Sequence, residues 1–138
     1  MKYLGIDYGT KRVGIATSDD GGTMAFPFCV LPNTKTLIAD IALICTKEHV
    51  QSLVVGDSRN NRNQPNPLMA VVTPFAVALK AETGLPLVFV NEAFSSREAM
   101  HIQGDNIHND ASAAAIVLQS HLDRINPTPL DEEGDEIV

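Results

Sequence analysis

The stretch that decides the fold of this chain is Tyr3-Leu-Gly-Ile-Asp7-Tyr-Gly-Thr-Lys-Arg12-Val-Gly-Ile-Ala16. Two short apolar runs flank a Gly-Thr turn that carries two cations, and Gly9 permits a tight turn. This pattern predicts an antiparallel hairpin. An acid, Asp7, stands near the end of the first run, and a carboxylate within a strand is costly to bury unless it is paired, hydrogen-bonded or bound to a metal. The alternative for Asp7 is an ordinary role in which its side chain caps the turn.

The length and composition indicate one domain. With 138 residues, of which 44% are hydrophobic, the chain can bury a single core. No apolar stretch approaches the ~20 residues of a membrane span, and the start of the chain lacks the features of a secretory signal. Cys29 and Cys45 lie in apolar surroundings and indicate neither a disulfide scaffold nor a zinc site. We therefore expect a soluble, cytoplasmic protein.

The formal net charge of −7 is unevenly distributed along the chain. Residues 131–138 hold five acids and no base, and without them 12 acids face 10 bases, a net charge of −2. A body close to neutral can still carry a local basic patch for phosphates, so the charge neither supports nor excludes a nucleic-acid substrate. Residues 127–138 are typical of a solvated, disordered tail, which leaves residues 1–126 as the folded domain.

The remaining pattern predicts a third strand followed by alternating helices and strands. Pro27 in the third strand favours an edge position or a bulge, and Asn33 or Thr34 is the expected cap of the first helix. This order predicts an α/β fold with a five-stranded mixed sheet, three antiparallel strands then crossover strands, and helices on both faces. Beyond the hairpin, strands are expected at 24–31, 52–56 and 85–91, and helices at 36–49, 66–83, 95–104 and 110–125.

A polar segment at 57–66 follows the strand at 52–56. Its Asn and Arg content indicates an exposed loop at the end of a strand, where α/β sheets place their ligands. Arg59 and Arg62 in this loop are candidates for contacts with a nucleic-acid backbone, and an ordinary surface loop is the alternative.

Two further acids stand at the ends of predicted elements. Singly, Glu92 is typical of a solvated strand end and Asp110 of a helix N-cap. The small residues after Asp110 allow the last helix to approach the sheet closely, and its start then lies near Asp7 and Glu92. Three converging carboxylates repel each other unless divalent cations neutralise them. Oxygen ligands favour Mg²⁺ or Mn²⁺, and two such ions can activate water for phosphodiester cleavage.

These acids lie in motifs that resemble a known family. From Tyr3 to about Arg124, nearly the whole chain, the sequence resembles the YqgF/RuvX family of Holliday junction resolvase-like proteins, also known as pre-16S rRNA nucleases. Besides the opening stretch, the motifs that carry the resemblance are Val54-Val-Gly56, Asn91-Glu-Ala-Phe-Ser-Ser96 and Asp110-Ala-Ser-Ala-Ala-Ala-Ile-Val-Leu-Gln119-Ser-His-Leu122.

The resemblance implies an RNase H-like fold and a metal-dependent nuclease. The family's acidic site falls on Asp7, Glu92 and Asp110, which would be both the catalytic residues and the ligands of two Mg²⁺ or Mn²⁺ ions. Lys11 and Arg12 are then expected to contact phosphates, with a solvated hairpin tip as the alternative. The implied substrate is structured RNA, in 5′-end maturation of pre-16S rRNA, or branched DNA such as a Holliday junction.

The chain departs from the family pattern near two of these motifs. Asn91 and Ala93 stand where the family has an acid and an arginine, and Asp57-Ser58 replaces an apolar residue and a proline. Substrate binding could therefore be weakened or retuned, and Asp57 could be a fourth metal ligand. His108, close to Asp110, is a weaker candidate for a place at the site.

Two other classes of function stay open. The Asp-x-Gly-Thr pattern also occurs in sugar kinases and actin-like ATPases, where the turn faces phosphates, but those proteins need two domains. The second class is a non-catalytic relative in which the fold binds RNA or protein. ATP binding by the isolated chain would favour the first class, and RNA binding without Mn²⁺ binding or cleavage would favour the second.

Overall fold

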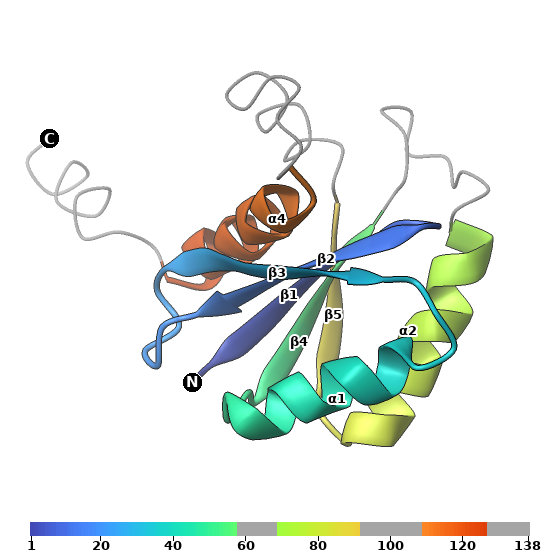
Figure 1. Cartoon of the computed structure of the whole chain (residues 1–138). Helices are drawn as coiled ribbons and strands as arrows, with labels where there is room; N and C mark the ends of the chain where they lie inside the picture. Colours follow the sequence, from blue (N-terminus) through green and yellow to red (C-terminus); the bar gives the residue numbers. More distant parts are fainter. Residues whose placement is uncertain (58–68, 92–108, 127–138) are drawn as a thin grey trace, which may run out of the picture.

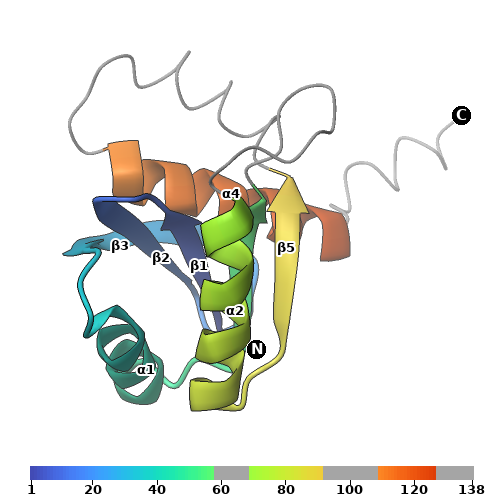
Figure 2. The ribbon, with the colours of Figure 1, turned by 90° about the vertical axis from the view of Figure 1, so that its right-hand side faces the viewer.

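The computed structural model describes residues 1–57, 69–91 and 109–126. A five-stranded sheet with the order β3-β2-β1-β4-β5 forms the centre of this part of the chain. Helices α1 and α2 lie next to each other on one face of the sheet, and α4 covers the other face (Figures 1 and 2). The elements are β1 (Tyr3–Tyr8), β2 (Arg12–Ser18), β3 (Ala25–Pro32), α1 (Leu37–Lys47), β4 (Ser52–Asp57), α2 (Met69–Thr83), β5 (Leu87–Asn91) and α4 (Asn109–Ile125).

The pairing of the strands confirms the predicted mixed sheet. β1, β2 and β3 are antiparallel neighbours, as the hairpin pattern predicts, whereas β4 and β5 join in parallel with β1. The parallel strands are reached by the crossover helices α1 and α2. Because helices cover both faces, the central strands are apolar on both sides, which explains their continuous apolar runs.

Alternation along β1 divides the apolar residues between two cores. Leu4 and Ile6 are fully buried in the core under α1 and α2. Gly5 faces the opposite side, where a Cβ atom would meet Leu118 and Ala114 of α4. The second core lies under α4 and is built from buried residues of the sheet and of the helix, Ala16, Val54, Val90, Ala114, Ala115, Val117, Leu118 and Leu122.

Helix α4 lies unusually close to the sheet because glycines stand beneath it. A Cβ atom added to Gly5 would lie 2.7 Å from Cβ of Leu118, and one added to Gly14 would overlap the carbonyl oxygen of Asp110. On the helix side the contact is made by alanines, and Ala114 is fully buried. The predicted close approach of this helix to the sheet is therefore confirmed, and it is set by small residues on both partners.

The third strand is an edge strand, as Pro27 predicts. β3 is the outermost strand beside β2, and the pairing register shifts between Ile15 and Ala16, whose partners are Cys29 and Pro27. Phe28 is thus the extra residue on β3. A proline without an N–H is tolerated at such a place because no ladder hydrogen bond is lost there.

The predicted cap of the first helix is wrong. The N-cap of α1 is Thr36, which makes no side-chain hydrogen bond to the helix backbone. Asn33 instead binds the hairpin turn, where its Nδ2 atom donates to the carbonyl of Gly9 at 2.8 Å and its backbone N–H donates to the carbonyl of Lys11 at 2.9 Å. We call this pair of hydrogen bonds the Asn33 clamp. A contact across 24 residues of sequence competes here with local capping.

The other boundaries agree with the sequence pattern where the structure describes them. Helix α2 ends at Thr83, and Gly84 follows with a positive φ of 71°, as expected of a C-terminal glycine. The predicted start of this helix, the predicted helix at 95–104 and the predicted tail at 127–138 lie outside the described residues. Among the described helices, none is long and apolar enough to cross a membrane.

Replacing Gly14 by alanine tests the contact beneath α4. We expect Gly14→Ala to lower the free energy of unfolding by about 2 kcal/mol or more, because the new Cβ forces Asp110 and the helix start away from the sheet. Urea denaturation measures this change. The matched control is Gly21→Ala, whose Cβ would meet no atom closer than Asp19 Oδ2 at 3.8 Å, so its effect should stay within about 0.5 kcal/mol. Equal midpoints for both variants would contradict the close contact.

Candidate active site

Three parallel strands end at one edge of the sheet. Ile6 of β1 pairs with Val55 of β4, so Asp7 lies where β4 approaches its carboxyl end. Asp57, the last residue of β4, pairs with Asn91, the last residue of β5. The carboxyl edge of a parallel sheet is the usual place for a ligand.

Asp7 lies on the α4 face of the sheet. It stands two residues beyond Gly5, which contacts α4, and successive residues of a strand alternate between faces. In the antiparallel pairing with β2, the partner of Asp7 is Gly14. The backbone of Asp110 rests on Gly14. The structure therefore brings two of the three predicted acids, Asp7 and Asp110, to the same face and the same edge.

The side chain of Asp110 is held by a cation from the hairpin. Nε of Arg12 lies 3.0 Å from Oδ2 of Asp110, and the two side chains are 66% and 31% exposed. Asp110 also belongs to the first turn of α4, where the helix dipole favours a negative charge. Arg12, the first residue of β2, thus neutralises one member of the predicted acid trio and lies at the site itself.

The turn that carries the cations is held in place by the Asn33 clamp. The clamp binds the carbonyl groups of Gly9 and Lys11, at the two ends of the turn between β1 and β2. Lys11 is exposed, and it forms no ion pair with any residue that the structure describes. In this part of the chain its charge is therefore not neutralised by an acid.

Several predicted site residues lie outside the described residues. These are Glu92, Arg59, Arg62 and His108, and the side chain of Asp57 is likewise not described. Glu92 directly follows Asn91, the last residue of β5, in the sequence. Within the described part of the chain no group of three His, Cys, Asp or Glu side chains is placed to hold a metal ion. The third member of the predicted trio, Glu92, therefore stays a prediction.

The residues present fit a hard divalent cation. Asp7 and Asp110 offer carboxylate oxygens, the ligands that Mg²⁺ and Mn²⁺ prefer. Both carboxylates stand on one face of the sheet, and one of them is already paired with a cation, Arg12. Acids gathered at one point need positive charge, and the guanidinium of Arg12 supplies it at Asp110.

Sequence reasoning missed the residues that position the acids. Gly5 and Gly14 set the height of α4 above the sheet, and Asn33 fixes the basic turn. Gln119 was also not singled out as a positioning residue, although its Oε1 accepts from the Ala25 N–H at 2.8 Å and ties α4 to β3. Only the glycines gave a signal, because a glycine inside a strand indicates close approach of another backbone.

The comparisons with known proteins agree with this geometry. A family model described as RuvX, Holliday junction resolvase, matches residues 1–124. A protein of Nitratidesulfovibrio vulgaris (strain DSM 19637 / Miyazaki F) named "Putative pre-16S rRNA nuclease" is 36% identical, over 88% of this chain and 93% of the relative. A protein of Oleidesulfovibrio alaskensis with the same name is 37% identical, over 97% of this chain and 100% of the relative.

Solved structures show the same fold at low sequence identity. A Thermus thermophilus RuvC bound to a Holliday junction substrate superposes with a TM-score of 0.60 at 16% identity, over 93% of this chain and 98% of that chain. The fowlpox virus Holliday junction resolvase gives a TM-score of 0.54 at 13% identity, over 90% of this chain and 99% of that chain. The RNase H-like fold of the resolvases, implied by the resemblance, is thereby confirmed.

The names of the family and of the relatives describe nucleases, which are hydrolases of phosphodiester bonds, and this agrees with the predicted enzyme class. The match covers residues 1–124 and includes the hairpin, Asp7, the basic turn and the start of α4. The chain therefore belongs to the RuvX family of Holliday junction resolvase-like nucleases.

Proposed function

We propose that this chain is a metal-dependent nuclease that cleaves structured RNA, and that its substrate is the 5′ end of pre-16S rRNA. The observation that carries the proposal is the convergence of Asp7 and Asp110 on one face at the carboxyl edge of the sheet. The name shared by the two bacterial relatives supports the choice of substrate.

In this proposal Asp7, Glu92 and Asp110 hold two Mg²⁺ or Mn²⁺ ions. Such ions lower the pKa of a bound water and stabilise the oxygen that leaves in phosphodiester hydrolysis. Asp7 is fixed by its place in the central strand β1, and Asp110 by the contact of α4 with Gly14. Glu92 completes the site and orients the attacking water, which forms a bond to phosphorus while the bond to the leaving oxygen breaks and that oxygen takes up a proton.

The cations of the hairpin bind the substrate in this proposal. Arg12 is 66% exposed, so its guanidinium can turn from Asp110 to a phosphate, where its planar fork makes two parallel hydrogen bonds. Lys11 adds a point charge beside it. Arg59 and Arg62 extend the contact along the nucleic-acid backbone. When Arg12 binds a phosphate of the substrate instead of Asp110, both carboxylate oxygens of Asp110 would be available to a metal ion.

Branched DNA is the second candidate substrate. The family description names a Holliday junction resolvase, and the RuvC structure with a TM-score of 0.60 holds a junction substrate. The same acids and cations would serve either polymer, because the contacts proposed here are to phosphates and carry no base or sugar selectivity.

Removing either described acid tests the metal site. We expect Asp7→Asn and Asp110→Asn to lose Mn²⁺ binding in calorimetry and to slow Mn²⁺- or Mg²⁺-dependent cleavage by more than about 100-fold, because each removes a charged ligand. The substrates are a pre-16S rRNA 5′ end, single-stranded RNA and a four-way DNA junction.

The matched control for this experiment is Asp123→Asn. Asp123 is a carboxylate of the same helix α4, but its partner is Gln119 at 2.9 Å. The Asp123→Asn variant should cleave the substrates as fast as the unchanged chain. Cleavage that persists in Asp7→Asn would exclude Asp7 as a ligand, and RNA binding without Mn²⁺ binding or cleavage by the unchanged chain would favour the non-catalytic relative.

Removing Arg12 should weaken nucleic-acid binding without weakening metal binding. In Arg12→Ala we expect Mn²⁺ affinity to be equal or higher, since Asp110 loses a competing cation. RNA affinity should fall, and the slope of log affinity against log salt should decrease by about one. The control Lys2→Ala removes a cation paired with Glu48 at 3.3 Å, which is not part of the site. If Arg12→Ala weakens both kinds of binding alike, the proposed exchange of partners is wrong.

The Asn33 clamp provides a test of positioning. Asn33→Ala should cost about 1 kcal/mol of stability and weaken RNA binding at least about twofold, because the turn with Lys11 and Arg12 loses one hydrogen bond. Asn126→Ala is the matched control, since Asn126 Nδ2 also donates to a glycine carbonyl, that of Gly22, at 2.8 Å. It should cost similar stability and leave RNA affinity unchanged. Equal RNA affinities in the two variants would show that the clamp serves stability alone.

A further inference from the structure

A pocket lies between α1 and α2, away from the candidate active site. Its volume is about 420 Å³, in the range of small-molecule sites. It is lined by residues along α1, from Ala39 to Thr46, by the last turn of α2, and by Val50 and Leu85, which precede β4 and β5. The pocket therefore lies at the amino ends of these parallel strands, opposite the edge that carries Asp7.

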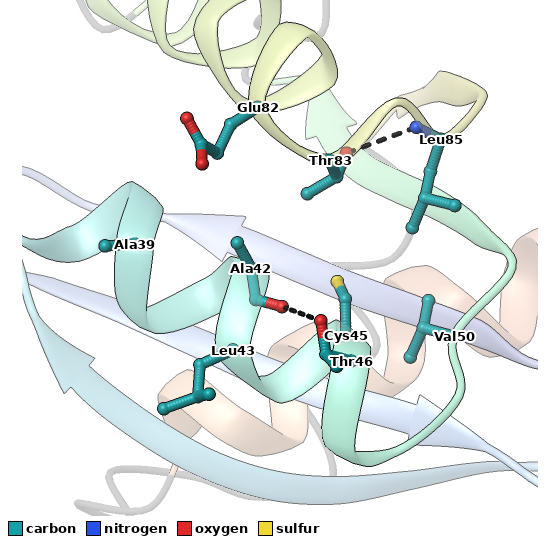
Figure 3. Close-up of a pocket in the computed structure, with 9 residues that line it drawn as sticks. All are labelled: Ala39, Ala42, Leu43, Cys45, Thr46, Val50, Glu82, Thr83 and Leu85. Atoms are coloured by element: carbon teal, nitrogen blue, oxygen red, sulfur yellow. Dashed lines mark hydrogen bonds between the residues drawn. The ribbon is translucent and has the colours of Figure 1, made fainter.

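The walls of the pocket are almost equally apolar and polar, and small or aliphatic side chains of α1 form part of the apolar half. Ala39 and Ala42 on α1 are small, and they leave space between the two helices (Figure 3). The thiol of Cys45 forms part of the wall, and burial raises its pKa to about 11, so it is uncharged at neutral pH. The apolar part of the wall can contact the hydrocarbon body of a small ligand.

The threonine hydroxyls at the pocket are already used within the protein. Thr46 Oγ1 donates to the carbonyl of Ala42 at 3.2 Å, and Thr83 Oγ1 donates to the carbonyl of Leu79 at 2.9 Å (Figure 3 draws the first of these bonds). Thr83 Oγ1 also accepts from the N–H of Leu85 at 3.3 Å. These hydroxyls therefore offer little to a polar ligand.

Glu82 is the one charged residue among those that line the pocket. Its carboxylate lies on the side of α2 that faces α1 (Figure 3). Within the described part of the chain, Glu82 makes no ion pair or hydrogen bond. Both helices end beside the pocket, and a helix C-terminus carries a partial negative charge. Lys47 and Lys80 belong to these last turns, but neither lines the pocket.

We propose that this pocket binds a small organic cation, a primary amine with an aliphatic or aromatic body. The body lies against Ala39, Ala42 and Cys45, and the ammonium group binds the carboxylate of Glu82. The negative ends of two helices and one exposed carboxylate that pairs with no described residue favour a cation over a neutral or anionic ligand of the same shape. This site is independent of the nuclease reaction and of its metal ions.

The test is a titration followed by amide chemical shifts, with three probes of similar shape. They are phenethylamine, the neutral 2-phenylethanol and the anion 3-phenylpropanoate. We expect phenethylamine to shift the amides around the pocket and to bind at least about threefold more tightly than the alcohol, with the anion weakest. Glu82→Gln should reduce the affinity for the amine to that for the alcohol and leave the affinity for the alcohol unchanged.

Two further variants complete the design. Glu48→Gln removes a carboxylate that follows α1 but does not line the pocket, and its affinity for the amine should stay within about twofold of the unchanged chain. Ala42→Leu fills the pocket and should abolish binding of all probes. The proposal is overturned if the amine and the alcohol bind equally, if Glu82→Gln binds the amine as before, or if no probe shifts the amides of the pocket.

Discussion

The close contact of α4 with Gly5 and Gly14 is the constraint on which the rest of the structure depends. At Gly14 no side chain separates the sheet from the backbone of Asp110, so the first turn of the helix rests on the strand that pairs with Asp7. A larger residue at either position would lift the helix and separate the two acids. The same contact buries the alanines of α4, so stability and the geometry of the site have one origin.

The sheet separates two kinds of binding surface. Its carboxyl edge gathers Asp7, Asp110 and the basic turn, where charges of both signs lie close together. Its amino edge holds a pocket of apolar and polar walls with one carboxylate, Glu82, between two helices. The direction of the parallel strands explains this division, because loops and helix starts meet at one edge and helix ends meet at the other.

The helices and strands could be predicted from local sequence patterns. The N-cap of α1 and the contacts between elements could not. The hairpin, the edge strand with Pro27 and the end of α2 at Gly84 were predicted because each depends on neighbouring residues. The cap of α1 was predicted wrongly because Asn33 binds Gly9 on another element. Local capping and a distant hydrogen bond differ by little in free energy, so tertiary packing decides between them.

The sequence by itself determined the class of fold, the strand that carries Asp7, the helix whose first turn holds Asp110, and the family. Periodicity, turn residues and motifs are properties of short segments, and they can be read without coordinates. Only the tertiary structure decided that Asp110 pairs with Arg12, that Asn33 holds the basic turn, and that α1 and α2 leave a pocket beside Glu82. These features depend on contacts between residues that lie far apart in the sequence. Local sequence patterns carry no information about such contacts.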